Sequence, residues 1–115
     1  MKDVSELLPL SPATLHILLA LAGEDLHGYG IMQEIARQSD GRYKLGPGTL
    51  YDNLQRLMEQ GIVEEVARRS AKDDPRRRYY RLSNLGRSLL GAEITRLESV
   101  IRDARLHLGA KPRRA

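Results

Sequence analysis

The 115-residue sequence contains no cysteine, no tryptophan and no phenylalanine, and it has five tyrosines. Without thiols the chain can form neither disulfides nor thiolate metal sites, which is compatible with a reducing compartment. Aliphatic side chains must therefore supply most of the core. The 41% of hydrophobic residues suffices for one small domain, and no second folded domain is expected.

Long apolar runs are also missing. No stretch approaches the roughly 20 residues that span a bilayer. The opening MKDVSELLPLSP contains acidic residues and lacks the long apolar segment of a signal peptide. We therefore expect a cytoplasmic protein with no membrane partner.

Motifs for catalysis and metal binding are absent as well. His16, His27 and His107 fall on separate expected helices, without a paired ligand spacing such as HExxH. Gly28, Tyr29 and Gly30 superficially resemble a glycine-rich phosphate loop, but the lysine and the preceding strand of a nucleotide-binding loop are not present beside them. The sequence predicts no enzyme, no metal and no cofactor.

Positive charge is concentrated in one short segment. Residues 1–67 carry 5 Lys or Arg against 10 Asp or Glu, residues 68–81 carry 7 against 2, and residues 82–115 carry 7 against 3. Such a cluster is typical of a surface that binds a polyanion. A solvated polar surface without a partner is the alternative.

Capping residues and glycines predict four helices, over about residues 11–22, 27–38, 48–60 and 83–108. Ser11 followed by Pro12 is typical of a helix start, and Ser83 is a second candidate cap. After Gly61, β-branched residues and a polar turn predict a hairpin with strands near residues 62–68 and 77–82.

Three helices followed by a hairpin predict a mainly α fold with a small β-hairpin, the winged helix-turn-helix, plus a long C-terminal dimerisation helix. We divide the chain into a winged-helix DNA-binding domain (1–82), the dimerisation helix (83–108) and a basic flexible tail (109–115).

The third helix is the expected reading helix of this fold. Apolar residues mark its inner face. The candidate DNA-binding residues on and around its outer face are Gly48, Thr49, Tyr51, Asp52, Gln55 and Arg56. Glutamine suits adenine, arginine suits guanine, and a threonine methyl suits thymine. For Tyr51, a phosphate contact and a buried structural role both remain open.

The outer face is nearly neutral, because Asp52 and Glu59 offset Arg56. Affinity for DNA must then come from the hairpin, where Arg76, Arg77 and Arg78 are the candidate phosphate contacts.

The last helix carries a heptad seam. Its members, spaced 4, 3, 4, 3 and 4 residues apart, are Leu90, Ile94, Leu97, Ile101, Ala104 and Leu108. Ile17 and Leu21 on a spare face of the first helix complete the predicted dimer interface. The alternative is that the stripe packs only on its own chain.

Three strings together are similar to the PadR family of bacterial transcriptional regulators: PLSPATLHILLALAGEDLHGYGIMQEI, GTLYDNLQRLMEQGIVEE and RRRYYRLSNLG. The resemblance covers about residues 8–108. It implies a dimeric winged-helix repressor of the short subclass, in which the last helix completes the dimer. It also implies that the helix from Gly48 reads the operator, with Thr49, Leu50 and Tyr51 in the family's characteristic place.

Some short members of the family hold flat aromatic drugs between tryptophans of the C-terminal helices. By register, that position is Leu97 here. Two alternatives follow: an aliphatic pore that admits an apolar small-molecule effector, or a closed interface.

We therefore predict a sequence-specific regulator, a repressor that binds double-stranded DNA as a homodimer on an inverted-repeat operator. An alternative is a winged-helix protein-interaction module without specific DNA binding. A small-molecule carrier that has lost DNA binding is a third.

Overall fold

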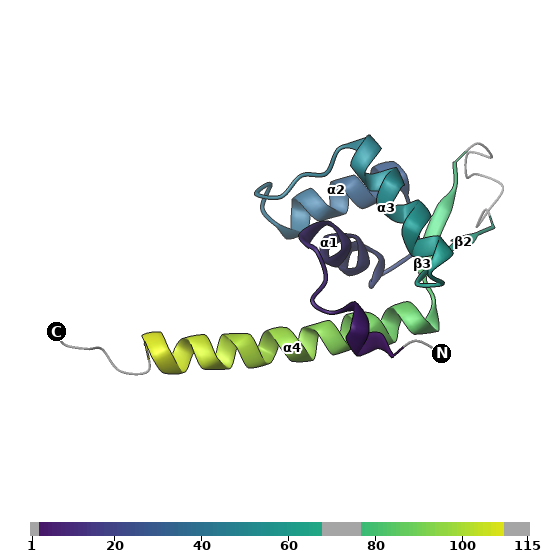
Figure 1. Ribbon diagram of the computed structural model, residues 1–115. Coiled ribbons are helices and arrows are strands. Elements are labelled where there is room, and N and C mark those ends of the chain that lie inside the picture. Colours follow the sequence, from purple (N-terminus) through teal and green to yellow (C-terminus); the bar gives the residue numbers. More distant parts are fainter. Residues whose placement is uncertain (1–2, 68–76, 110–115) are drawn as a thin grey trace.

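The chain forms a helical body with a small sheet at one edge and a long helix that extends away from the body (Figure 1). The computed structural model describes residues 3–67 and 77–109. In chain order the elements are η1 (Val4–Leu7), α1 (Pro12–Leu21), β1 (Leu26–His27), α2 (Gly28–Gln38), α3 (Pro47–Glu59), β2 (Val63–Val66), β3 (Tyr79–Leu82) and α4 (Asn84–Leu108). The predicted mainly α winged-helix architecture is confirmed.

Side-chain caps fix where two of the helices begin. The Ser11 Oγ accepts a hydrogen bond from the Thr14 amide at 3.2 Å, and a proline follows in the first turn of α1. At α4, the Ser83 Oγ accepts from the Gly86 amide at 3.0 Å and donates to the Gly61 carbonyl at 2.6 Å. Both predicted starts are confirmed, and the second cap also ties α4 to the segment that follows α3.

The sheet has three antiparallel strands in the order β1-β3-β2, where the sequence predicted a two-stranded hairpin. The additional strand β1 consists only of Leu26 and His27, which pair with Tyr80 and Tyr79. Two residues are too few for an alternating pattern, so no sequence signal marked this strand. The pairing places the start of α2 directly beside the wing formed by β2 and β3.

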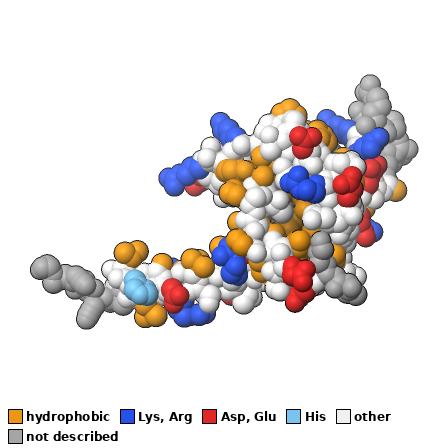
Figure 2. Space-filling view, viewed as in Figure 1, with side chains coloured by type: hydrophobic (Ala, Val, Ile, Leu, Met, Phe, Trp, Pro, Cys, Tyr) orange, Lys and Arg blue, Asp and Glu red, His pale blue; other side chains and the backbone are white. Residues whose placement is uncertain are grey.

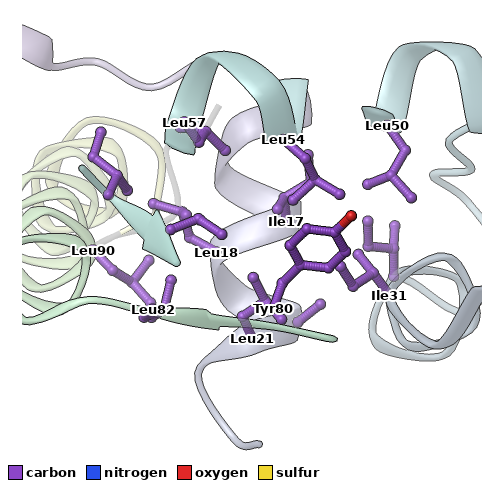
Figure 3. Close-up of a cluster of buried hydrophobic side chains, with 14 of the residues drawn as sticks. Ile17, Leu18, Leu21, Ile31, Leu50, Leu54, Leu57, Tyr80, Leu82 and Leu90 are labelled. Atoms are coloured by element: carbon purple, nitrogen blue, oxygen red, sulfur yellow. The ribbon is translucent and has the colours of Figure 1, made fainter. Parts of the chain in front are cut away.

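The core lies between the helices and one face of β3 (Figure 3). Its labelled members are Ile17, Leu18 and Leu21 of α1, Ile31 of α2, Leu50, Leu54 and Leu57 of α3, Tyr80 and Leu82 of β3, and Leu90 of α4. Along β3, Tyr80 and Leu82 are buried whereas Arg81 is exposed, as the predicted alternation requires.

The prediction that Ile17 and Leu21 lie on a spare face of α1 is wrong. Their exposed fractions are 0% and 1% within the single chain. They share the inward face with Thr14 and Leu18, at the spacing i, i+3, i+4 and i+7 of one helix side. Because Thr14 is polar, hydrophobicity alone assigned the wrong side of α1 to the core.

The first turns of α4 belong to the body, and the rest of the helix extends beyond it. Leu90 is buried within its own chain, so its predicted place in an intersubunit seam is also wrong. All described residues from 98 to 109 are exposed. The 25 residues of α4 span about 37 Å. Of the predicted basic tail, only Gly109 lies within the described residues.

Within the described ranges, no helix combines the length and the apolar character needed to cross a lipid bilayer.

Candidate nucleic-acid interface

The outer face of α3 is exposed to solvent. Leu50, Leu54 and Leu57 point into the core and fix the rotation of the helix. The predicted reading residues are all exposed: Gly48, Thr49, Tyr51, Asp52, Gln55 and Arg56. The structure therefore brings these six together on one accessible surface, with Tyr51 at the side that faces the start of α2.

Hydrogen bonds along α3 hold several of these side chains in place. Arg56 donates through Nη2 to the Asn53 Oδ1 at 2.6 Å, and the Asn53 Nδ2 donates to the Thr49 carbonyl at 2.9 Å. The Gln55 Nε2 donates to a carboxylate oxygen of Glu59 at 3.1 Å. Since Asn53 is a neutral amide, it orients Arg56 without neutralising its charge. Sequence reasoning did not single out Asn53, because a buried asparagine resembles any polar position of the helix.

The described arginines of the wing differ in the side chains that lie beside them. Arg81 forms an ion pair with Glu64 at 3.1 Å, and Arg78 approaches Glu65 at 3.6 Å. Arg77 is exposed, and its Nη1 lies 2.7 Å from the Nε2 of His27. The third predicted phosphate contact, Arg76, lies outside the described residues.

A pocket of about 360 Å³ joins α3 to the wing. It is lined by His27, Gly28, Tyr29, Tyr51, Arg77, Arg78 and Tyr80. A Cβ at Gly28 would overlap the Tyr51 hydroxyl, so this glycine allows the tyrosine to pack against the start of α2. Three predicted residues thus meet in one place: Tyr51, Arg77 and Arg78.

Four further pocket residues were missed from the sequence: His27, Gly28, Tyr29 and Tyr80. The available signal was the HGYG string at the expected start of α2, where a histidine cap and two small residues leave room for neighbouring side chains. The His27 Nδ1 accepts a hydrogen bond from the Gly30 amide at 3.0 Å, so His27 caps the start of α2. No pattern in the sequence indicated that β1 would bring this cap beside β3.

Burial raises the pKa of Tyr80, and the neighbouring Tyr51 and Glu65 add to this effect, whereas Arg78 opposes it. The phenol of Tyr80 is therefore protonated at neutral pH and can act as a hydrogen-bond donor. Figure 3 shows its hydroxyl directed toward the side of Leu50 and Ile31, which lie near the starts of α3 and α2.

The remaining seam residues of α4 differ from Leu90. Ile94, Ile101, Ala104 and Leu108 are exposed and Leu97 is half-buried. Figure 2 shows hydrophobic side chains on the part of α4 that extends beyond the body. The single chain therefore leaves a hydrophobic stripe of the projecting helix exposed to water.

Comparisons with known proteins identify the same architecture. The model of the transcriptional regulator PadR-like family matches residues 17–92. The transcriptional regulator Rv3488 of Mycobacterium tuberculosis is 36% identical over 89 residues, which cover 77% of this chain and 78% of that protein.

Two solved structures share the fold. A PadR family transcription regulator from Clostridium difficile is 26% identical, with a TM-score of 0.69, covering 86% of this chain and 100% of that one. Bacillus subtilis PadR, solved in complex with operator DNA, is 20% identical with a TM-score of 0.61, covering 75% of this chain and 48% of that one. At this lower identity the likeness concerns the fold alone.

Proposed function

Because the chain belongs to the PadR-like family of transcriptional regulators, we propose that it binds duplex DNA sequence-specifically as a homodimer and represses transcription. The observation that carries the proposal is the pocket in which Tyr51 of α3 meets Arg77 and Arg78 of the wing. A reading helix and a cationic wing that share one continuous surface can contact base edges and phosphates of the same duplex.

In this proposal the two parts of the surface have different tasks. Gln55, Arg56 and Thr49 contact base edges in the major groove and set the preferred sequence. The wing arginines contact phosphates and supply most of the affinity, because the face of α3 is nearly neutral. Bacillus subtilis PadR, which shares the fold, was solved on operator DNA, and this supports the assignment by analogy.

Dimerisation supplies the second reading helix. The part of α4 that starts at Ile94 exposes apolar side chains, with Ile101 46% and Leu108 81% exposed in the single chain. Packing these residues against a second copy removes them from water. In this proposal residues 1–82 bind DNA and residues 83–108 form the dimer. The first turns of α4 also pack against the helical body of their own chain.

Two copies related by a two-fold axis recognise an inverted repeat, with half-sites about one helical turn apart. An apolar effector, if one acts here, must bind the free and DNA-bound geometries with different affinity. Since the proposed partner is duplex DNA, the proposal assigns the protein to the cytoplasm.

Footprinting on the DNA upstream of the protein's own coding region tests this function. A protected inverted repeat at nanomolar protein concentration is the expected result. A protein-interaction module would leave that DNA unprotected and would instead bind a protein partner through α3. A small-molecule carrier would show ligand affinity and no protected operator.

A further inference from the structure

The pocket between α2, α3 and the wing is lined mainly by hydrogen-bond donors. The described residues around it contribute three phenols, two guanidinium groups and one imidazole. The first turn of α2 also borders it through Gly28 and Tyr29, whose amides precede the first intrahelical hydrogen bonds. Donors from three separate elements therefore converge on one space.

The side of the pocket at His27 is defined by its capping bond. The Nδ1 of His27 accepts a hydrogen bond from the Gly30 amide, which holds the ring at the start of α2. The Nε2 of the same ring lies 2.7 Å from the Nη1 of Arg77. This contact places the Arg77 guanidinium beside the first turn of α2, where its other N–H groups can donate to an anionic oxygen.

Phenols also line the pocket. Tyr51 is 48% exposed, and its hydroxyl packs against Gly28 at the start of α2. Tyr80 is 3% exposed and lines the same space. Neutral hydroxyls beside a guanidinium group and a helix N-terminus are a donor set that suits phosphate oxygens.

Among the described residues, an acidic side chain lies near Arg78. Glu65 lies 3.6 Å from Arg78, so the charge of Arg78 is partly offset. Arg77, which faces His27, is the stronger candidate for the charge contact.

We propose that this pocket holds one backbone phosphate of the bound duplex, gripped by the Tyr51 hydroxyl, the Arg77 guanidinium and the first amides of α2. This inference rests on the proposed DNA-binding function and specifies one of its contacts. The clamped phosphate fixes α3 relative to the DNA backbone, because the same side chain, Tyr51, belongs to the reading helix and to the pocket.

The test compares two phenol deletions. Tyr51→Phe removes a hydroxyl from the pocket, and Tyr43→Phe removes one from a half-buried ring that stacks on His16 elsewhere in the chain. Binding to a footprinted operator is measured by fluorescence anisotropy over a range of salt concentrations. We expect Tyr51→Phe to weaken binding about tenfold or more, because it removes a hydrogen bond to a charged group. The salt slope should stay unchanged, because no charge is removed.

Arg77→Gln removes a charge at the same place and provides an independent variant. It should weaken binding and reduce the salt slope by about 0.9. Tyr43→Phe should bind as the wild type does. Thermal unfolding of each variant verifies that the body remains folded.

The phosphate itself is located with operators in which single phosphates are replaced by neutral methylphosphonates. One replacement beside the reading helix should weaken the wild type more than it weakens Tyr51→Phe, since the variant has already lost the Tyr51 hydrogen bond and retains only the Arg77 and amide contacts to that phosphate. If Tyr51→Phe binds as tightly as the wild type, or loses affinity equally at every methylphosphonate, the proposed phosphate contact is wrong while the DNA-binding function stands. If the wild type binds no duplex, both are wrong.

A third arm separates DNA from free phosphate. Inorganic phosphate is titrated while the amide signals of Gly28 and Tyr29 are followed by NMR. Saturation by free phosphate, with no coupling between Tyr51→Phe and any methylphosphonate, would assign the pocket to a small anion and overturn the proposal.

Discussion

Glu93 is a carboxylate buried in the first half of α4, with an exposed fraction of 1%. Its two oxygens accept hydrogen bonds from Arg96, at 2.6 Å to Nε and 3.0 Å to Nη2, and one also accepts from the Leu10 amide at 3.1 Å. These bonds connect the segment before α1 to α4. The Arg96 hydrogen bonds, helped by the Leu10 amide, hold the pKa of Glu93 below its usual range despite burial.

Glu93→Gln should lower the free energy of unfolding at pH 7 by about 1–3 kcal/mol, because an amide cannot accept both Arg96 bonds. A carboxyl whose folded-state pKa is lowered stabilises the protein above its unfolded-state pKa. That contribution disappears as the pH falls through the folded-state pKa. Urea denaturation should therefore show a difference between wild type and variant that shrinks from pH 7 toward acidic pH.

Glu98→Gln is the matched control, since Glu98 is exposed on the same helix. It should leave the unfolding free energy nearly unchanged. An equal effect of both substitutions would contradict the structural role of Glu93.

In the proposed function, the wing arginines supply most of the affinity for DNA. The triple variant R76A/R77A/R78A should weaken binding to every duplex sequence. It should also flatten the dependence of log affinity on log salt by about 0.9 for each phosphate that the wing no longer neutralises. Gln55→Ala should instead change which sequence is preferred. Binding by the triple variant with an unaltered salt slope would remove the wing from the interface.

For single residues, the sequence predicted which side chains are exposed better than it predicted which other residues they contact. The outward side of α3 followed from the spacing of Leu50, Leu54 and Leu57. Thr14 and Asn53 could not be identified as buried, because polar side chains are buried only where tertiary neighbours satisfy them, and those neighbours come from distant parts of the chain. The same limitation hid Glu93 and placed Ile17 and Leu21 on the wrong side of α1.

Among the elements, α4 contains two glycines with opposite roles. A Cβ at Gly86 would overlap the backbone carbonyl oxygen of Ile62, whereas a Cβ at Gly91 would meet nothing within 4 Å. Gly86 is therefore required for the close approach of α4 to the strand side of the body, and Gly91 has no such constraint in the single chain.

Gly86→Ala should destabilise the fold by about 1–3 kcal/mol, because the backbone of α4 must shift away from Ile62. Gly91→Ala should instead stabilise it by up to about 1 kcal/mol through helix propensity. Thermal unfolding of both variants measures the contrast. A stabilised Gly86→Ala protein would show that α4 does not pack as closely as described.

Element boundaries were largely predictable where a cap marks them. Ser11 and Ser83 fixed two helix starts, and Gly61 with its positive φ of 76° fixed the end of α3. The strand β1 was not predictable, because two residues form a strand only through pairing with Tyr79 and Tyr80. The pocket depends on that pairing. The sequence therefore predicted Tyr51, Arg77 and Arg78 as DNA-binding residues, but not that they line one pocket.

For the whole molecule, the projecting part of α4 matters most, because a single chain leaves its apolar side chains exposed to water. Ile101→Glu places a charge in the middle of the exposed stripe. We expect the wild type to sediment as a species of twice the 13.0 kDa chain mass at micromolar concentration, and this variant to sediment as a single chain.

Ser99→Glu adds the same charge outside the heptad seam and should remain dimeric. A wild-type protein that sediments as one chain would contradict the proposed homodimer, and a dimeric Ile101→Glu variant would move the interface away from this stripe.

Two copies of this chain, in the function proposed above, present paired reading helices to duplex DNA. Selection of bound sequences from a random DNA pool tests this arrangement most directly, because one result reports binding, symmetry and spacing together. We expect enrichment of an inverted repeat whose half-sites lie about one helical turn apart. No enrichment, or a single half-site without its repeat, would contradict it.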